Sequence, residues 1–315
     1  MSDDVAIILT AGLVATATGL IGPFLVLRRV ALVGDAVSHA VLPGIVMIFL
    51  VFHTRAPLAV VVGASVFAVV CVLGIDALKG TGLVKSDAAI GLVFPVLFSL
   101  GVLGITRYAA DIHLDLDSTI YGEIAFAPFR TLSIGGVEIA RSIVQLACVS
   151  LFNLALITLL WKEIKATTFD PDFSRTIGIR PALLSRLLLV AVAVTAVIAF
   201  ESVGAILVVT MIIVPAATAY LLTDRLRVMV ALAVAIGWMS AVAGHTGASA
   251  IDASIAGAMG LAAACGFALA LLASPRYGLL ARSAQQARRR KSMARALEAE
   301  RRVTPPLVSG KGPAG

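Results

Sequence analysis

The stretch LVGDAVSHAVLPG, Leu32 to Gly44, places an aspartate and a histidine inside one of the long apolar runs of this chain. Asp35 and His39 are four positions apart, so in a helix both lie on one face, and Pro43 continues the same line. An aspartate at bilayer depth costs roughly 2.5–3.5 kcal/mol on insertion scales. A pairing partner, water in a cavity or a bound cation has to offset that cost. The fold therefore depends on whether these apolar runs span a membrane, and the function on what the two side chains bind.

The composition answers the first question. The 315 residues are 60% hydrophobic, whereas soluble domains contain about 45–50% apolar residues. Runs of roughly 20 apolar residues, enough to cross a bilayer, occur at about 5–27, 32–52, 57–78, 88–105, 139–161, 183–200, 203–222, 228–243 and 251–272. Because Glu201, Gly204 and Pro215 interrupt the sixth and seventh runs, we expect an all-α, polytopic integral membrane protein with eight to nine transmembrane helices. We assign residues 1–280 to the membrane domain and 281–315 to a basic cytoplasmic tail.

The distribution of Lys and Arg fixes the expected orientation. With the N-terminus outside, 21 of the 25 basic residues fall on the cytoplasmic side, as the positive-inside rule requires. The C-terminus is then cytoplasmic. We interpret the arginine-rich segment from Arg282 to Arg302 as part of this pattern, not as a nucleic-acid-binding element. Cys71, Cys148 and Cys265 all lie in apolar runs without metal-ligand spacing, so we expect them to be packing residues.

The same orientation leaves an outer surface rich in acids, which would attract cations. Among them we single out four as candidates for receiving metal at the outer face: Asp115, Asp117, Glu123 and Glu201. The first three belong to the polar stretch from Arg107 to Phe126, which also reads as an ordinary solvated loop. Glu201 equally reads as a residue at a helix end in water. His53 and His245 are expected in exterior loops without a role.

A second polar stretch, TTFDPDFSRTIGIRP from Thr167 to Pro181, carries the signals of a short cytoplasmic helix. Asp170 suits the N-cap and Pro171 the first helical position. Gly178 suits a left-handed stop, and Pro181 prevents continuation. The predicted two-turn helix is too short to span and would present Phe169, Phe173 and Ile177 on one side. It is either an ordinary interfacial helix or a docking element for a cytosolic partner.

Asp35 and His39 are candidate metal ligands. A carboxylate and a neutral imidazole suit Mn²⁺, Fe²⁺ or Zn²⁺ better than Ca²⁺ or Mg²⁺. One helix supplies only two ligands, and a two-fold dimer with this helix at its axis would supply four. Gly34, Ala36 and Ser38 are among the small neighbours that would allow close approach. The alternatives are an aspartate at a helix end near the interface and a histidine satisfied by a backbone carbonyl.

Several segments resemble the permeases of the manganese/zinc/iron branch of the ABC transporters, nearly from end to end. The segments are LRRVALVGDAVSHAVLPG, KSDAAIGLVF, DLDSTIYGEI, FDPDFSRTIGI, ESVGAILVVTMIIVPAATAYLL and SPRYGLL. The resemblance implies a dimeric permease of the bacterial inner membrane, a homodimer or a heterodimer with a related permease. It also implies two further partners, a cytosolic ATP-hydrolysing subunit and an extracytoplasmic metal-binding protein. It places metal-pathway ligands at Asp35 and His39, and ATPase contacts at Phe169, Asp170, Pro171, Phe173 and Gly178.

We therefore expect a transport subunit, not an enzyme, that imports Mn²⁺, Zn²⁺ or Fe²⁺ and has no cofactor of its own. The chain lacks GxxxxGK[ST], so ATP would be used by the partner. The main alternative is a proton-coupled secondary metal transporter with Asp35, His39 and Glu201 as a relay. An intramembrane metalloenzyme is a weaker alternative, because the sequence has no HExxH and no evident third ligand.

Overall fold

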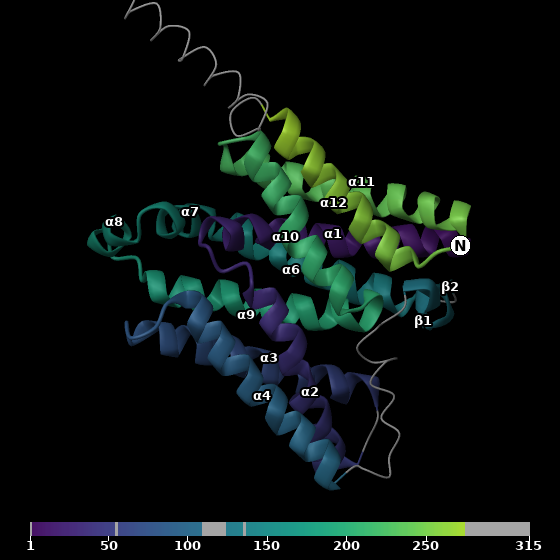
Figure 1. Ribbon diagram of the computed structural model, residues 1–315, viewed down its shortest axis with the longest axis horizontal. Helices are drawn as coiled ribbons and strands as arrows, with labels where there is room; N and C mark the ends of the chain where they lie inside the picture. Colours follow the sequence, from purple (N-terminus) through teal and green to yellow (C-terminus); the bar gives the residue numbers. More distant parts are fainter. Residues whose placement is uncertain (1, 54–55, 109–123, 135–136, 275–315) are drawn as a thin grey trace, which may run out of the picture.

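The computed structural model describes residues 2–53, 56–108, 124–134 and 137–274, which form a bundle of long helices (Figure 1). Nine helices in these residues are long and apolar enough to cross a bilayer. They are α1 (Asp3–Leu27), α2 (Val33–Phe52), α3 (Pro57–Gly80), α4 (Ser86–Tyr108), α6 (Arg141–Leu159), α9 (Pro181–Val203), α10 (Ala205–Leu222), α11 (Leu226–Ile251) and α12 (Ile255–Ala273). The prediction of an all-α membrane protein is confirmed. The proposed tail, 281–315, lies outside the described residues.

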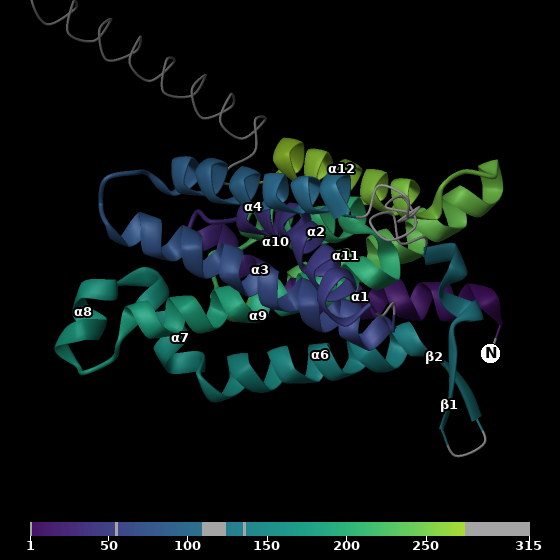
Figure 2. The ribbon, with the colours of Figure 1, turned by 90° about the horizontal axis from the view of Figure 1, so that it is seen from below.

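Five short elements lie at the two ends of the bundle. At the end that holds the N-terminus are the 3-10 helix η1 (Ile124–Phe129) and a hairpin of β1 (Thr131–Ile134) and β2 (Val137–Ala140) (Figure 2). Thr131 pairs with Ala140 and Leu132 with Ile139 in antiparallel register. At the opposite end lie α7 (Trp161–Phe169) and α8 (Pro171–Thr176). The hairpin corrects the sequence-based span 139–161, whose first residues pair as a strand.

Helix α9 joins two groups of helices. On one side α2 packs against both α3 and α4, and on the other α1 packs against α6, α10 and α11, with α12 covering α10 and α11. Helix α9 contacts α2 and α3 in the first group and α1 and α10 in the second. Figure 1 shows α2, α3 and α4 below α9 and the remaining spans above it. Asp35 and His39 on α2 therefore belong to the smaller group.

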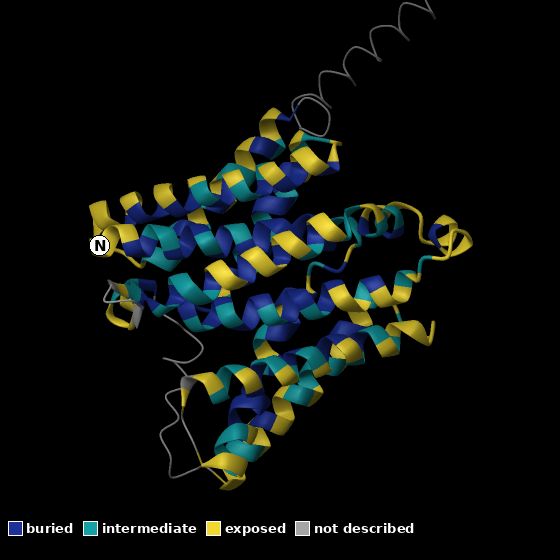
Figure 3. Cartoon of the chain, turned by 180° about the vertical axis from the view of Figure 1, so that it is seen from behind, coloured by how far each residue is buried: buried dark blue, intermediate teal, exposed yellow. Residues whose placement is uncertain are grey.

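Helix α1 is the centre of the larger group. In its most apolar window 72% of residues are buried, against 17% in each of α4 and α12, whose faces are largely exposed (Figure 3). Small residues allow this burial: a Cβ on Gly12 would lie 2.3 Å from the Trp238 ring, and one on Gly22 2.4 Å from the Ile212 carbonyl oxygen. Such small residues let transmembrane backbones approach closely.

Buried polar side chains fasten α1 to α6 and α9. The Asn153 Nδ2 group donates to the Ala17 carbonyl at 3.1 Å and to the Thr195 hydroxyl at 2.9 Å. The hydroxyls of Thr10 and Ser142 lie 3.2 Å apart nearer the hairpin end. Hydrocarbon offers no hydrogen-bond partners, so buried polar groups are expected to pair between helices. These contacts fix the relative positions of three spans.

Helix α11 extends further than the apolar pattern indicated. The expected span 228–243 is wrong at its end, because the helix continues to Ile251 and stops at Asp252, which is left-handed with φ +54°. His245 is consequently not in an exterior loop. It is buried in α11, and its Nε2 lies 3.1 Å from Asp4 Oδ1 on α1. Close packing permits the extension, since a Cβ on Gly244 would lie 2.3 Å from the Met259 backbone of α12.

Candidate metal site

Asp35 and His39 lie on the same face of α2, as the four-residue spacing predicted. His39 Nε2 is 4.0 Å from Asp35 Oδ1, and the two side chains are 47% and 52% exposed, respectively. The residues between and beside them, Ala36, Val37 and Ala40, are buried. The polar pair therefore faces away from the packed side of α2, at the surface of the chain.

Two aromatic rings of α4 hold the imidazole of His39. Its ring stacks on Phe94 with centroids 5.4 Å apart and meets Phe98 edge-on at 5.9 Å. Among the described residues, these ring contacts are what restricts the orientation of the imidazole. With the ring held in this way, little side-chain entropy remains to be lost when a metal binds.

The start of α2 stabilises the carboxylate of Asp35. Asp35 lies in the first turn of α2, where the positive end of the helix dipole favours an anion. The Ser38 hydroxyl donates to the Asp35 backbone carbonyl at 2.6 Å, within the same turn. A Cβ on Gly34 would lie 3.4 Å from Ile212, so α10 packs directly beside this turn. The N-terminal end of α2 thus offsets part of the free-energy cost of placing the Asp35 carboxylate at bilayer depth. A partner or a cation has to offset only the remainder.

Asp35 and His39 are the two candidate ligands that the described residues bring together at this position. Over the described residues, no group of three or more His, Cys, Asp and Glu side chains is close enough to hold a metal ion. Structural and catalytic sites for transition metals take at least three protein ligands. The pair on α2 can therefore contribute only part of a coordination sphere, and no further ligand for it lies among the described residues.

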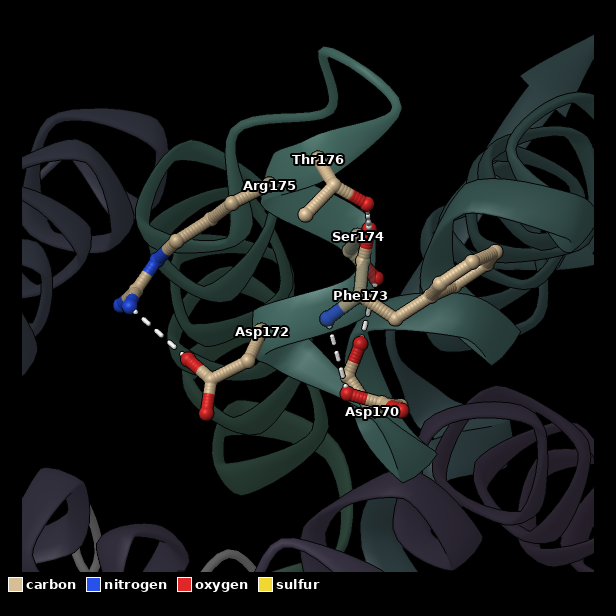
Figure 4. A network of polar contacts seen from close by, with 6 residues as sticks. All are labelled: Asp170, Asp172, Phe173, Ser174, Arg175 and Thr176. Carbon is tan, nitrogen blue, oxygen red and sulfur yellow. Dashed lines mark hydrogen bonds and ion pairs between the residues drawn. The ribbon is translucent and has the colours of Figure 1, made fainter.

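The short helix α8 confirms the start and stop signals read from the sequence. Asp170 Oδ1 accepts a hydrogen bond from the Phe173 backbone N–H at 2.9 Å, and the Ser174 hydroxyl donates to the Asp170 carbonyl at 2.7 Å (Figure 4). Pro171 occupies the first helical turn. Gly178 follows with φ +82°, a conformation that L side chains rarely adopt. A six-residue helix at the edge of the molecule is the result.

The apolar side chains around α8 are exposed, although they do not share one helix as predicted. Phe169 ends α7, Phe173 lies within α8, and Ile177 follows α8. They are 58%, 57% and 53% exposed, respectively. The non-helical Asp170 breaks the expected four-residue periodicity. Their exposure at the end of the bundle remote from the N-terminus still leaves an apolar surface available to a partner.

The outer acids are only partly accounted for. Asp115, Asp117 and Glu123 lie outside the described residues. Glu201 is near the end of α9 and is not free in water: Arg141 Nη2 lies 3.6 Å from its Oε1, and Gln145 Nε2 donates to its Oε2 at 3.4 Å. Both Arg141 and Glu201 are about one-fifth exposed. The carboxylate thus links α9 to α6.

Arg28 is a polar anchor that sequence reasoning missed. In the sequence it is one of the basic residues on the expected cytoplasmic side, but in the structure its guanidinium donates hydrogen bonds to Thr167 and Thr168 of α7. No local pattern signals a contact between positions about 140 residues apart. The two consecutive threonines before Phe169 are the sequence feature that could indicate a hydrogen-bonding site. Such pairs are too common to identify Arg28 as the partner.

Comparisons with known proteins agree with the resemblance read from the motifs. The profile of the ABC 3 transport family matches residues 5–274. The manganese transport system membrane protein MntD of Bacillus subtilis (strain 168) is 42% identical over 281 residues, covering 89% of this chain and 95% of the relative. The zinc transport system membrane protein TroD of Treponema pallidum (strain Nichols) is 43% identical over 276 residues, covering 88% and 75%. The solved structure of PsaBC from Streptococcus pneumoniae in complex with Fab matches with a TM-score of 0.70 and 30% identity, covering 86% of this chain and 91% of that one.

Proposed function

Because this chain belongs to the ABC 3 transport family and is a metal-transporting ABC permease, we propose that it imports a divalent transition metal into the cytoplasm. Mn²⁺ and Zn²⁺ are the candidates suggested by the names of the relatives, and Fe²⁺ suits the same ligands. The observation that carries the proposal is the outward-facing Asp35–His39 pair on α2.

The pair contacts the metal during transit, in this proposal. A carboxylate and a neutral imidazole bind Mn²⁺, Zn²⁺ and Fe²⁺. His39 has to be neutral to ligate, so protonation competes with the metal. Phe94 and Phe98 orient the ring toward the same exposed face on which the carboxylate lies.

A second permease chain completes the site. Both ligands are about half exposed in the single chain, and two copies related by a two-fold axis would bring two Asp and two His together. The neighbouring copy is either identical or a related permease. Mixed dimers with one wild-type and one Asp35→Ala chain are expected to lose uptake to nearly the same extent as the double variant. Half of the wild-type rate in the mixed dimer would instead indicate two independent sites.

ATP is used by a separate cytosolic subunit that docks on α8. Exposed Phe169, Phe173 and Ile177 and the capped start of α8 provide the contact surface. An extracytoplasmic binding protein delivers the metal to the opposite end, where Asp115, Asp117 and Glu123 are the candidate receiving residues. Glu201, the fourth candidate, is held by Arg141 and Gln145, and we expect it to have a structural role. This arrangement requires the N-terminus outside and the C-terminus in the cytoplasm of a bacterial cell.

The test is uptake of radioactive Mn²⁺ and Zn²⁺ into vesicles that contain the permease, its ATPase and its binding protein. Asp35→Ala and His39→Ala are expected to reduce uptake more than about tenfold, since even an outer-shell change at a metal site costs 10–100-fold. Matched controls are Asp87→Asn, another aspartate in the first turn of a helix, and His53→Asn at the far end of α2. Uptake at the wild-type rate in either alanine variant would refute the site.

The same vesicles separate the proposal from a proton-coupled transporter. An ABC importer requires internal ATP and is indifferent to an imposed pH gradient when ATP is absent. Uptake driven by the gradient without the ATPase would favour the secondary transporter. Arg141 and Gln145 already engage Glu201, which makes that residue a poor member of a proton relay.

A further inference from the structure

Arg28 fastens the end of α1 to the end of α7. Its Nε donates to the Thr168 hydroxyl at 3.1 Å and its Nη2 to the Thr167 hydroxyl at 3.0 Å. Both hydroxyls donate their own protons within α7, Thr167 to the Glu163 carbonyl at 2.9 Å and Thr168 to the Ile164 carbonyl at 2.7 Å. Their lone pairs therefore remain to accept from the guanidinium, and all four hydrogen bonds are mutually consistent.

The environment of Arg28 makes this contact specific. The side chain is partly buried, and burial lowers the pKa of its guanidinium from the ordinary value. Within the part of the chain that the structure describes, no carboxylate forms an ion pair with it at 4.0 Å or less. The C-terminal ends of α1 and α7 lie beside it and supply partial negative charge. A charge-assisted hydrogen bond of this kind holds its geometry better than an exposed ion pair does.

A second contact joins the same two helices. The rings of Phe24 on α1 and Trp161 on α7 meet edge-on with centroids 6.3 Å apart. The C-terminal end of α7 is followed directly by Asp170, which caps the first turn of α8. Helix α7 is thus held to α1 at both of its ends, and α8 is its immediate continuation.

The connection from Arg28 to the candidate metal ligands is short and internally bonded. Asp35 follows Arg28 by seven residues. Between them the Val30 N–H donates to the Leu25 carbonyl at 3.0 Å, and the Val33 N–H to the Val30 carbonyl at 3.1 Å. Arg29 adopts φ +57°, which turns the chain sharply. These hydrogen-bonded turns restrict the connection between α1 and α2. A displacement of the end of α1 is therefore expected to move the first turn of α2.

We propose that Arg28 is a positioning residue that transmits movement of α8 and α7 to the turn of α2 carrying Asp35. The proposal rests on the function proposed above, in which the ATPase acts on α8. Movement of α8 can also reach α2 by a second path, through residues 177–180 into α9, because α9 contacts α2 as well. Breaking the Arg28 contact is therefore expected to loosen the coupling between ATP hydrolysis and metal movement without abolishing the assembly.

The experiment measures Mn²⁺ taken up per ATP hydrolysed, in vesicles that contain permease, ATPase and binding protein. Arg28→Gln removes the guanidinium, and the double variant Thr167→Val, Thr168→Val removes the acceptors while keeping side-chain shape. Arg29→Gln, at an exposed neighbour, removes the same charge and is the control for the first. Thr158→Val, an exposed threonine whose hydroxyl bonds only within its own helix α6, is the control for the second.

Both test variants are expected to lower the ratio at least about fivefold, the factor that corresponds to about 1 kcal/mol of lost interaction. ATP hydrolysis and recovery of the intact complex are expected to stay near wild type, and Arg28→Lys is expected to restore part of the ratio. An unchanged ratio in the double threonine variant would overturn the proposal, as would a parallel fall of uptake and hydrolysis, which indicates a purely structural contact. If the wild-type complex itself takes up none of Mn²⁺, Zn²⁺ and Fe²⁺, the proposed function fails instead.

Discussion

Replacing Asp170 with alanine removes the side-chain cap of α8, in which Oδ1 accepts from the Phe173 N–H at 2.9 Å. Loss of such a cap costs about 0.5–2 kcal/mol, typically near 1. Helix α8 has six residues, and isolated helices shorter than about 12–15 residues are marginal in water. The hydrogen bond from the Ser174 hydroxyl to the Asp170 carbonyl and the Arg175–Asp172 ion pair remain, but Phe173 is exposed and the helix lies at the edge of the bundle (Figure 3). The helical form of this segment should therefore be less populated.

The expected effect is on docking and not on global stability. If the ATPase binds α8 only when it is helical, the apparent affinity falls with the helical fraction, so about 1 kcal/mol of lost helix stability weakens it about two- to threefold. Thermal unfolding of the permease should barely change, since the buried core lies elsewhere. Binding of the purified permease in lipid nanodiscs to immobilised ATPase subunit, measured by interferometry, gives the dissociation constant directly.

Asp170→Asn is the matched control. Asparagine caps as well as aspartate does and keeps the acceptor oxygen while removing the charge. The affinity of this variant is expected to stay close to wild type. Wild-type affinity in Asp170→Ala would refute the reasoning outright. An asparagine variant as weak as the alanine variant would show that the charge, and not the cap, contributes to binding.

Three further predictions concern the bundle and its outer end. Asn153→Leu removes the hydrogen bonds that join α6 to α1 and α9. It should lower the free energy of unfolding, measured by SDS titration, by about 0.6–1.7 kcal/mol. The control Thr158→Val, at an exposed position on the same helix, should change this free energy far less. Gly22→Ala places a Cβ 2.4 Å from a backbone oxygen of α10 and should lower the free energy of unfolding by about 1–3 kcal/mol. Gly91→Ala, whose Cβ would meet open space, should not lower it. Equal effects of the two substitutions would contradict the packing. Glu201→Gln breaks one partly buried ion pair, so we expect a loss below about 1 kcal/mol and an unchanged Mn²⁺ concentration for half-maximal uptake. A several-fold rise in that concentration would instead mark Glu201 as a metal-receiving residue.

The parts of the structure that the sequence predicted are those governed by local chemistry. Asp170 with Pro171 starts a helix, and Gly178 ends one, whatever lies nearby. The spacing of Asp35 and His39 fixes a shared face in any helix. The apolar runs likewise define the spans, because each must match the thickness of a bilayer. These expectations need no knowledge of the partner helices.

The parts that were wrong or missed depend on contacts between distant segments. Helix α11 continues past its apolar run because Asp4 of α1 accepts a contact from His245, and Gly244 lets α12 approach. The arginine–threonine contact between α1 and α7 joins positions about 140 residues apart. A histidine near the end of an apolar run reads as an exterior residue until its partner is known. Only the packed bundle shows which polar groups are satisfied.

The placement of polar groups separates structural from functional positions in this chain. Asn153 and Thr195 are fully buried and hydrogen-bonded across helices, and Arg28 and Glu201 each reach a partner on another helix. Asp35 differs: its carboxylate is about half exposed, and among the described residues its ion-pair partner is the imidazole of the next turn, at 4.0 Å. Polar groups that stabilise a membrane bundle are expected to face inward, because hydrocarbon leaves them no other partner. The outward orientation of this carboxylate and imidazole thus supports the proposal that they lie at an interface with a second chain and contact a passing cation.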